Sequence, residues 1–108
     1  MIPSYHAHVY YDASSREAAA AVREGLFEQF PVQIGRWHDT PVGPHPQAMY
    51  QVAFKGEAFR PIVEWLMLHR QGLTVLVHPE TGDALADHRD HCFWMGQKLP
   101  LNFSTLGG

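Results

Sequence analysis

The chain has 108 residues, of which 45% are apolar and 18% charged, and its formal net charge is −3. This length provides for one hydrophobic core, so we expect a single domain over residues 1–108, and the apolar share excludes a disordered chain. The small negative charge offers no basic stripe that could displace counterions from phosphates, so we expect no nucleic-acid partner.

The single cysteine, Cys92, excludes an internal disulfide framework and CxxC redox chemistry. We interpret it as a small buried residue in a reducing cytosol, and we expect a cytoplasmic location. The first residues, from Met1, have neither the basic nor the apolar region of a signal peptide. No apolar run approaches the roughly 20 residues of a membrane helix, so no membrane partner is expected. The sequence has no P-loop, GxGxxG, GxSxG or HExxH motif.

The first third of the chain predicts a strand and then a helix. Residues 5–11 combine aromatic and β-branched residues with a period of two, which is typical of a strand. Ser14 and Glu17 have capping-box spacing, and a helix is expected from there to about Gln29, where Pro31 stops it. Its apolar stripe consists of Ala19, Val22, Leu26 and Phe30.

The rest of the chain predicts two more strands, a second helix and a fourth strand. Residues 32–38 and 47–54 are expected to be strands, separated by a loop over residues 39–46 that contains three prolines. A helix is expected over residues 56–69, with Gly72 as its stop signal, and a strand over residues 73–78. The segment from Ala84 fits either a helix or an extended conformation, and residues 99–108 are expected to form an irregular tail. The expected inner side of the second helix consists of Phe59, Ile62, Val63, Leu66 and Met67.

The order of these elements, βαββαβ, predicts an α+β fold of the ferredoxin-like plait type. One antiparallel sheet would carry both helices on one face, with strands 5–11 and 47–54 central and strand 73–78 beside strand 5–11. The helix-free face would remain exposed in a monomer. We therefore expect a homodimer, in the form of an α/β-barrel-like assembly. That face is expected to carry His6, His8, Tyr10, Leu76 and His78.

Histidine is the outlier of the composition, with eight residues in the chain. His6 and His8 point to the same side of their strand, and pairing with strand 73–78 would bring His78 beside them. Imidazole is the commonest ligand of Fe, Zn, Cu and Ni, so a metal site is expected there. His88 and His91 lie close enough along the chain to complete or surround it.

Several residues also have ordinary structural interpretations. A lone strand histidine is usually a surface or satisfied core residue, and we interpret His38 and His69 as surface residues. His45 lies in the proline-rich loop, where either interpretation is open. Arg36 and Trp37 are either structural or directed toward a substrate. Four carboxylates accompany the histidines of residues 73–91, and we expect Asp87 and Asp90 to orient imidazoles. These four are Glu80, Asp83, Asp87 and Asp90.

The pattern as a whole resembles the DOPA 4,5-dioxygenase family. The similar segments are residues 6–11 (HAHVYY), 41–46 (PVGPHP), 73–83 (LTVLVHPETGD), 87–91 (DHRDH) and 94–96 (WMG). Together they extend over about residues 4–98, nearly the whole chain. The combination is specific, although no single segment would be.

The resemblance implies an extradiol ring-cleaving dioxygenase with non-haem Fe(II), a ferredoxin-like and usually dimeric fold, and a catechol such as DOPA with O2 as substrates. The product would be a semialdehyde. Six histidines match the family's positions, and three of them would replace the more usual 2-His-1-carboxylate set. Zn or another divalent metal could occupy the same ligands. The matching histidines are His6, His8, His45, His78, His88 and His91.

From these matches we assign His6, His8 and His78 as metal ligands. His45, His88 and His91 are the catalytic candidates, and His88 or His91 would take the catechol proton. The substrate ring and a substrate carboxylate need further partners, for which we expect Tyr10, Trp37 and Phe54, and Arg36 or Arg89, respectively. The alternative hypotheses are a non-catalytic metal- or ligand-binding module and a metal-free dimeric scaffold.

Overall fold

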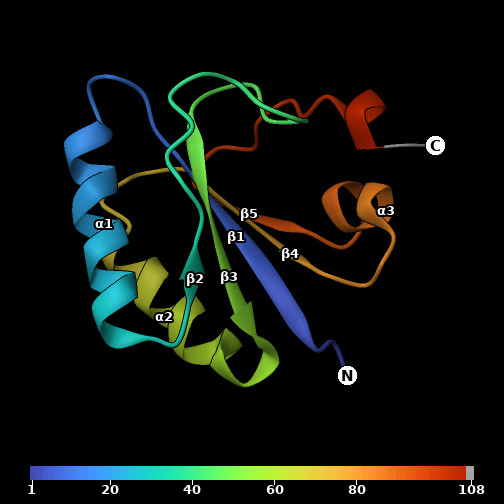
Figure 1. The fold of residues 1–108 in the computed structure, drawn as a ribbon, viewed down its shortest axis with the longest axis horizontal. Helices are drawn as coiled ribbons and strands as arrows, with labels where there is room; N and C mark the ends of the chain where they lie inside the picture. Colours follow the sequence, from blue (N-terminus) through green and yellow to red (C-terminus); the bar gives the residue numbers. More distant parts are fainter. Residues whose placement is uncertain (107–108) are drawn as a thin grey trace.

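The computed structural model describes residues 1–106 and contains one five-stranded sheet (Figure 1). All the pairings between its strands are antiparallel, and the strand order is β2-β3-β1-β4-β5. The strands are β1 (Ser4–Tyr10), β2 (Gln33–Ile34), β3 (Met49–Lys55), β4 (Val75–Pro79) and β5 (Phe93–Met95). The helices are α1 (Arg16–Gln29), α2 (Phe59–His69) and α3 (Ala84–Arg89), with 3₁₀ turns at Gly56–Ala58 and Phe103–Leu106.

The topology confirms the ferredoxin-like α+β plait. β1 lies between β3 and β4, as the βαββαβ order predicts, and β5 extends the sheet beyond β4. The segment from Ala84 was expected to be either helical or extended, and it contains both: first the helix α3 and then the strand β5. The tail has one 3₁₀ turn rather than being irregular throughout, and residues 107 and 108 lie outside the described range.

The start of α1 differs from the predicted capping box. The helix begins at Arg16 with Ser15 at the N-cap, and no side chain caps it. Asp12 organises this turn instead, because its Oδ1 accepts hydrogen bonds from the backbone N–H groups of Ser14 and Ser15 at 2.9 and 3.0 Å. An aspartate that accepts bonds from residues two and three positions on forms a turn of its own, and this replaces the Ser14–Glu17 exchange.

The second strand is shorter than predicted. Only Gln33–Ile34 pairs regularly with β3, and the chain rejoins β3 through one isolated bridge between His38 and Met49. On α2, Met67 is 63% exposed, so its predicted place on the inner side is wrong. The helical stripe that faces the sheet is narrower and runs through Ile62, Val63 and Leu66.

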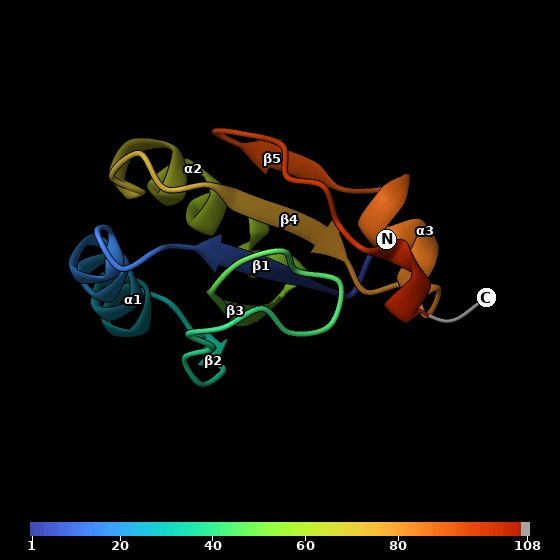
Figure 2. The same cartoon turned by 90° about the horizontal axis from the view of Figure 1, so that it is seen from above.

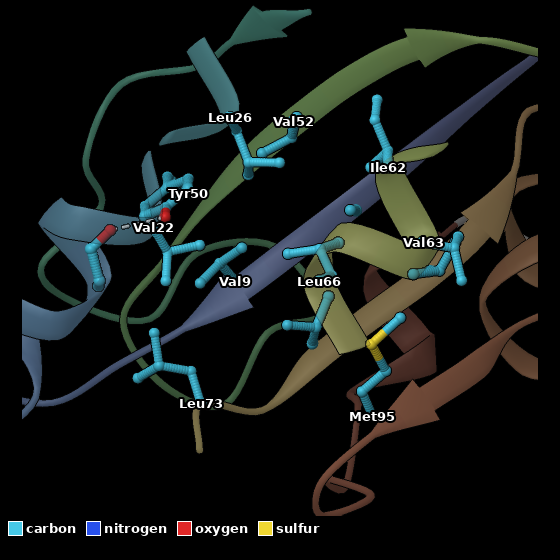
Figure 3. Close-up of a cluster of buried hydrophobic side chains, with 14 of the residues drawn as sticks. Val9, Val22, Leu26, Tyr50, Val52, Ile62, Val63, Leu66, Leu73 and Met95 are labelled. Atoms are coloured by element: carbon cyan, nitrogen blue, oxygen red, sulfur yellow. Dashed lines mark hydrogen bonds between the residues drawn. The ribbon is translucent and has the colours of Figure 1, made fainter. Parts of the chain in front are cut away.

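The main core lies between the sheet and helices α1 and α2 (Figure 3). Alternate residues of the strands face it, including Val9, Val52 and Val77, and α1 contributes Val22 and Leu26. Burial of one such side chain contributes about 1.5–3 kcal/mol.

The opposite face of the sheet is covered, which contradicts the expectation that it is exposed. Figures 1 and 2 show α3 and the C-terminal segment on the side of the sheet away from α1 and α2. Leu76 and Tyr10 are 0% and 1% exposed, and they pack with Met49 in a second apolar cluster. The tail closes this side, where Leu99 and Leu101 join the cluster. An exposed sheet face therefore no longer supports a dimer, and the dimer remains a prediction.

Candidate metal centre

The pairing of β1 with β4 brings three of the predicted histidines together. His6 is directly opposite His78 in the antiparallel register, and His8 follows on the same face. The Nε2 atoms of His8 and His78 are 3.0 Å apart although 70 positions separate the residues. The ring centroid of His6 lies 5.3 Å from that of His78 and 6.1 Å from that of His8. Period-two alternation and strand order are sufficient to produce this convergence.

Two further imidazoles approach from outside the sheet. His45, in the proline-rich loop, lies with its ring centroid 4.3 Å from that of His8. The ring of His88, on α3, lies 4.0 Å from that of His78. The loop is held over this face by the tail, since the backbone N–H of Asn102 donates to the carbonyl of Pro44 at 2.8 Å. Five imidazoles from β1, the loop, β4 and α3 thus form one cluster.

Two overlapping sets of three imidazoles in this cluster have the spacing of a metal site. In each set the potential ligand atoms all lie within 4.8 Å of one another. One set is His6, His8 and His78, and the other is His8, His45 and His88. His8 belongs to both.

The outer nitrogens of these rings are directed toward acceptors. The Nδ1–H of His78 donates to the carbonyl of Pro79 at 2.9 Å, and that of His88 donates to the carbonyl of Ala84 at 2.7 Å. A ring that donates from Nδ1 carries its lone pair on Nε2. Metal-binding histidines in proteins are usually held in this manner, with the second ring nitrogen bonded to a carbonyl or a carboxylate.

Burial disfavours the charged form of four of these imidazoles. The pKa of His45 and of His78 is lowered from the ordinary 6.5 to about 4, mainly by loss of solvation and in part by neighbouring imidazoles. The pKa of His8 is lowered well below 6.5 for the same reasons, and that of His6 is also lowered by burial. Metal ligands have to be neutral imidazoles, so this environment suits a cation and disfavours protons.

His8 provides a direct test of whether the residues fit a metal ion. It is 3% exposed, its Nδ1 has no hydrogen-bond partner among the described residues, and its Nε2 faces another ring nitrogen. A buried polar atom without a partner costs about 1–3 kcal/mol. Nitrogen donors that face one another inside a neutral, desolvated pocket are the arrangement that Fe, Zn or a similar divalent ion satisfies. The donor set therefore fits a metal.

Tyr10 was expected to pack on a substrate ring, but its hydroxyl is occupied inside the protein. The hydroxyl oxygen lies 2.6 Å from Nδ1 of His45, and the side chain is 1% exposed. Its ring stacks on Trp94 with centroids 5.8 Å apart. Burial raises the pKa of the Tyr10 phenol, so the hydroxyl keeps its proton and can donate it to His45. Tyr10 thus fixes the orientation of His45.

The other predicted substrate-binding residues are not brought to the cluster. Trp37 lies on the α1 side, 5.1 Å from the ring of Tyr50 and beneath the guanidinium of Arg16, because its large ring packs, partly buried, against the main core. Arg36 is exposed on the neighbouring stretch of chain. Phe54 also faces the main core.

His91 likewise lies apart from the five imidazoles. It would share a helix face with His88 if the helix continued, but α3 ends at Arg89. His91 is exposed and lines a cavity of about 490 Å³ together with Phe59 and Phe93. His78 also lines this cavity, so the cavity reaches the edge of the histidine cluster, but His91 belongs to neither imidazole set.

The carboxylates of this region are arranged differently from expectation. Asp87 is 2% exposed and accepts hydrogen bonds from the N–H and Oγ1 of Thr81 at 2.8 and 2.6 Å. Asp90 pairs with Arg89 at 2.9 Å, so Arg89 is also engaged on the surface. Glu80, for which the sequence suggested no role, lies with Oε1 3.0 Å from Nδ1 of His6. The alternation that aligns Leu76 with His78 continues to Glu80 and could have identified it.

The fold and the cluster together define a ferredoxin-like protein whose sheet carries a histidine site able to hold a metal ion. No helix among residues 1–106 has the length and apolar character that a membrane crossing requires.

Comparison with known proteins assigns the family. The model of the Dopa 4,5-dioxygenase family matches residues 5–105, and the chain belongs to this family. It is 31% identical to the DOPA 4,5-dioxygenase of Amanita muscaria over 97% of this chain and 50% of that protein. It is 39% identical to an uncharacterized 21.2 kDa protein of Botryotinia fuckeliana, over 95% and 63% of the two chains. The chain therefore spans between half and two thirds of the length of these two relatives.

A solved structure supports the same assignment. The crystal structure of a candidate dioxygenase from Nostoc punctiforme is similar with a TM-score of 0.96 and 58% sequence identity. The similarity covers 97% of this chain and 91% of that one. The dioxygenase family and its fold are thus shown.

Proposed function

We propose that this chain is a non-haem Fe(II) dioxygenase that cleaves a catechol ring in the extradiol manner with O2 and forms a semialdehyde. The observation that carries the proposal is the convergence of five imidazoles on one sheet face in a member of a dioxygenase family. DOPA, named for the relative from Amanita muscaria, belongs to the proposed substrate class.

We assign His6, His8 and His78 as the metal ligands. These three come from two strands in direct register, whereas the alternative set needs one residue from a loop and one from a six-residue helix. Ligands on paired strands hold their geometry better than ligands on loops. An Fe(II) ion bound to three neutral imidazoles would retain open positions for catecholate and O2 and transfer electron density between them.

His88 is the residue that we assign to proton transfer. Its Nδ1–H is held by the carbonyl of Ala84, so Nε2 is available to accept the proton of a catechol hydroxyl and to return it later. The pKa of about 4 makes His45 a weak base at neutral pH. We assign His45, held by Tyr10, to hydrogen bonding with the substrate or oxygen instead. His91 has no part in this scheme, because it is exposed and belongs to neither imidazole set.

Oxygen consumption tests the proposal. The protein is first reconstituted with Fe(II) under anaerobic conditions. When O2 and a catechol are then added, it should consume O2 and form a yellow product. The His88→Gln variant should retain iron but lose turnover by about 10²–10⁴-fold, the usual contribution of a general base. The His69→Gln variant is the matched control, because His69 is exposed and bonded only to its own helix. Absence of turnover on a broad catechol panel would refute the proposed substrate class.

The coordination number distinguishes catalysis from a non-catalytic metal-binding module. X-ray absorption of the Zn²⁺ and Fe²⁺ forms would count the imidazoles around the metal. Three imidazoles with open positions support the dioxygenase, whereas a closed set of four would favour a structural metal site. His8 makes the second outcome a real alternative, since it belongs to both imidazole sets.

A further inference from the structure

The three imidazoles that we assign to the metal are held to different degrees. His8 and His78 are 3% and 1% exposed, so surrounding side chains fix their rings. The His6 side chain is 24% exposed and lies at the solvent edge of the cluster. Among residues 1–106 its polar side-chain contact is to Glu80, whose Oε1 lies 3.0 Å from Nδ1. The orientation of His6 therefore depends on a residue outside the imidazole set.

The backbone places Glu80 where it can perform this role. β4 ends at Pro79, but the N–H of Glu80 donates to the carbonyl of Ser4 at 3.0 Å and continues the ladder with β1 by one step. Glu80 therefore stands opposite Ser4 and diagonal to His6, on the face that carries His78. The same Oε1 lies 3.6 Å from Nδ1 of His78, so one carboxylate oxygen approaches the outer nitrogens of two imidazoles.

The other carboxylates of this region are engaged elsewhere. Asp87 receives both of its hydrogen bonds from Thr81. Asp90 pairs with Arg89, and Asp83 accepts from a backbone N–H at the start of α3. Among the described acidic residues that follow β4, Glu80 is the one whose carboxylate oxygen lies at ion-pair distance from an imidazole nitrogen.

We propose that Glu80 is the positioning carboxylate of the metal centre. It holds Nδ1 of His6 so that Nε2 points into the cluster, and it adds one negative charge beside a ligand set that has none. A carboxylate on the outer nitrogen of a ligating histidine fixes the tautomer and makes the ring a better donor. This inference rests on the ligand assignment proposed above, and it assigns to Glu80 the role expected of Asp87 and Asp90.

Metal affinity of three variants tests the proposal without any assay of turnover. Zn²⁺ affinity is measured by competition with a chromophoric chelator, and Co²⁺ binding by its visible absorption bands. Glu80→Ala should weaken Zn²⁺ binding by about 10–100-fold, the usual effect of removing such a partner. Glu80→Gln should bind more tightly than Glu80→Ala, because its amide oxygen still accepts a hydrogen bond. Asp90→Asn is the matched control: it neutralises a carboxylate of similar exposure, 46% against 40%, that contacts no imidazole.

The outcomes separate this inference from the proposed function. If the unaltered chain binds neither Zn²⁺ nor Co²⁺, the metal centre itself is refuted. If the unaltered chain binds metal, the Glu80→Ala variant is the deciding measurement. A Zn²⁺ affinity within twofold of that of the unaltered chain, together with the same Co²⁺ spectrum, would refute the role of Glu80 alone. If Glu80→Ala does not fold in a urea titration, Glu80→Gln decides the matter: weaker binding and altered Co²⁺ bands support positioning, and unchanged values overturn it.

Discussion

Acid should destabilise the metal-free protein well above the pH at which carboxylates titrate. His45 and His78 are buried, and burial lowers the pKa of each to about 4 against 6.5 for an ordinary histidine. Between these values the unfolded chain binds protons that the folded chain does not. The stability that these neutral histidines contribute is therefore fully present above pH 6.5 and decreases as the pH drops through 6.5. Below pH 4 the titration of these histidines causes no further decrease.

The size of the effect follows from the two pKa values. At pH 5 an unfolded histidine with a pKa of 6.5 is almost fully protonated, whereas a folded one with a pKa of 4 is mostly neutral. The free energy of unfolding should then fall by about 2 kcal/mol per imidazole between pH 8 and pH 5, or about 4 kcal/mol for both. A domain of this kind is stable by about 5–15 kcal/mol, so the loss is easily measured.

Urea unfolding in the presence of a chelator, followed by circular dichroism at pH 8, 6.5 and 5, gives the free energies. His78→Gln removes one titrating group and should reduce the loss by about 2 kcal/mol. His69→Gln, at an exposed helix position, should leave the loss unchanged. A free energy of unfolding that stays constant within about 1 kcal/mol from pH 8 to pH 5 would refute the lowered pKa values of His45 and His78.

Three further substitutions test the site and the core. His8→Ala should abolish stoichiometric Zn²⁺ binding in equilibrium dialysis and His69→Ala should not; loss of metal in the second variant alone would show that the ligands are misassigned. Tyr10→Phe leaves Nδ1 of His45 without its partner and should lower the free energy of unfolding by about 1–3 kcal/mol with metal stoichiometry unchanged. Leu66→Ala, at a fully buried position, should cost about 2–5 kcal/mol in urea unfolding, and a cost below 1 kcal/mol would contradict its place in the core.

The sheet and three of the five clustered imidazoles follow from the sequence because both depend on period-two alternation. Once residues 5–11 and 73–78 are neighbouring strands, the apolar residues that face α1 and α2 fix the register, and the register brings His6 and His8 to His78. The prediction needed only the strand order and the identity of the buried face.

The rest of the site depends on contacts that have no periodic signal. His45 lies in a loop whose position is set by Asn102 on the tail, and no local pattern links these two segments. His91 was expected beside His88, but α3 ends two residues before it. Trp37 alternates with Arg36 at the end of a predicted strand that is largely absent, so its side could not be inferred. In each case tertiary packing decides the position.

The separation of the histidines along the chain has a consequence for folding. His8 and His78 meet across 70 positions, so their nitrogens face each other only after β1 and β4 have paired. Closing so long a loop costs chain entropy, and the unfolded chain therefore offers no comparable set of donors. A metal ion that binds only the folded chain at 100 times its dissociation constant would add about 2.7 kcal/mol to the free energy of unfolding. A metal ion that binds only after β1 and β4 have paired would slow unfolding rather than speed folding. Metal supply would then govern the lifetime of the folded chain rather than the rate of its formation.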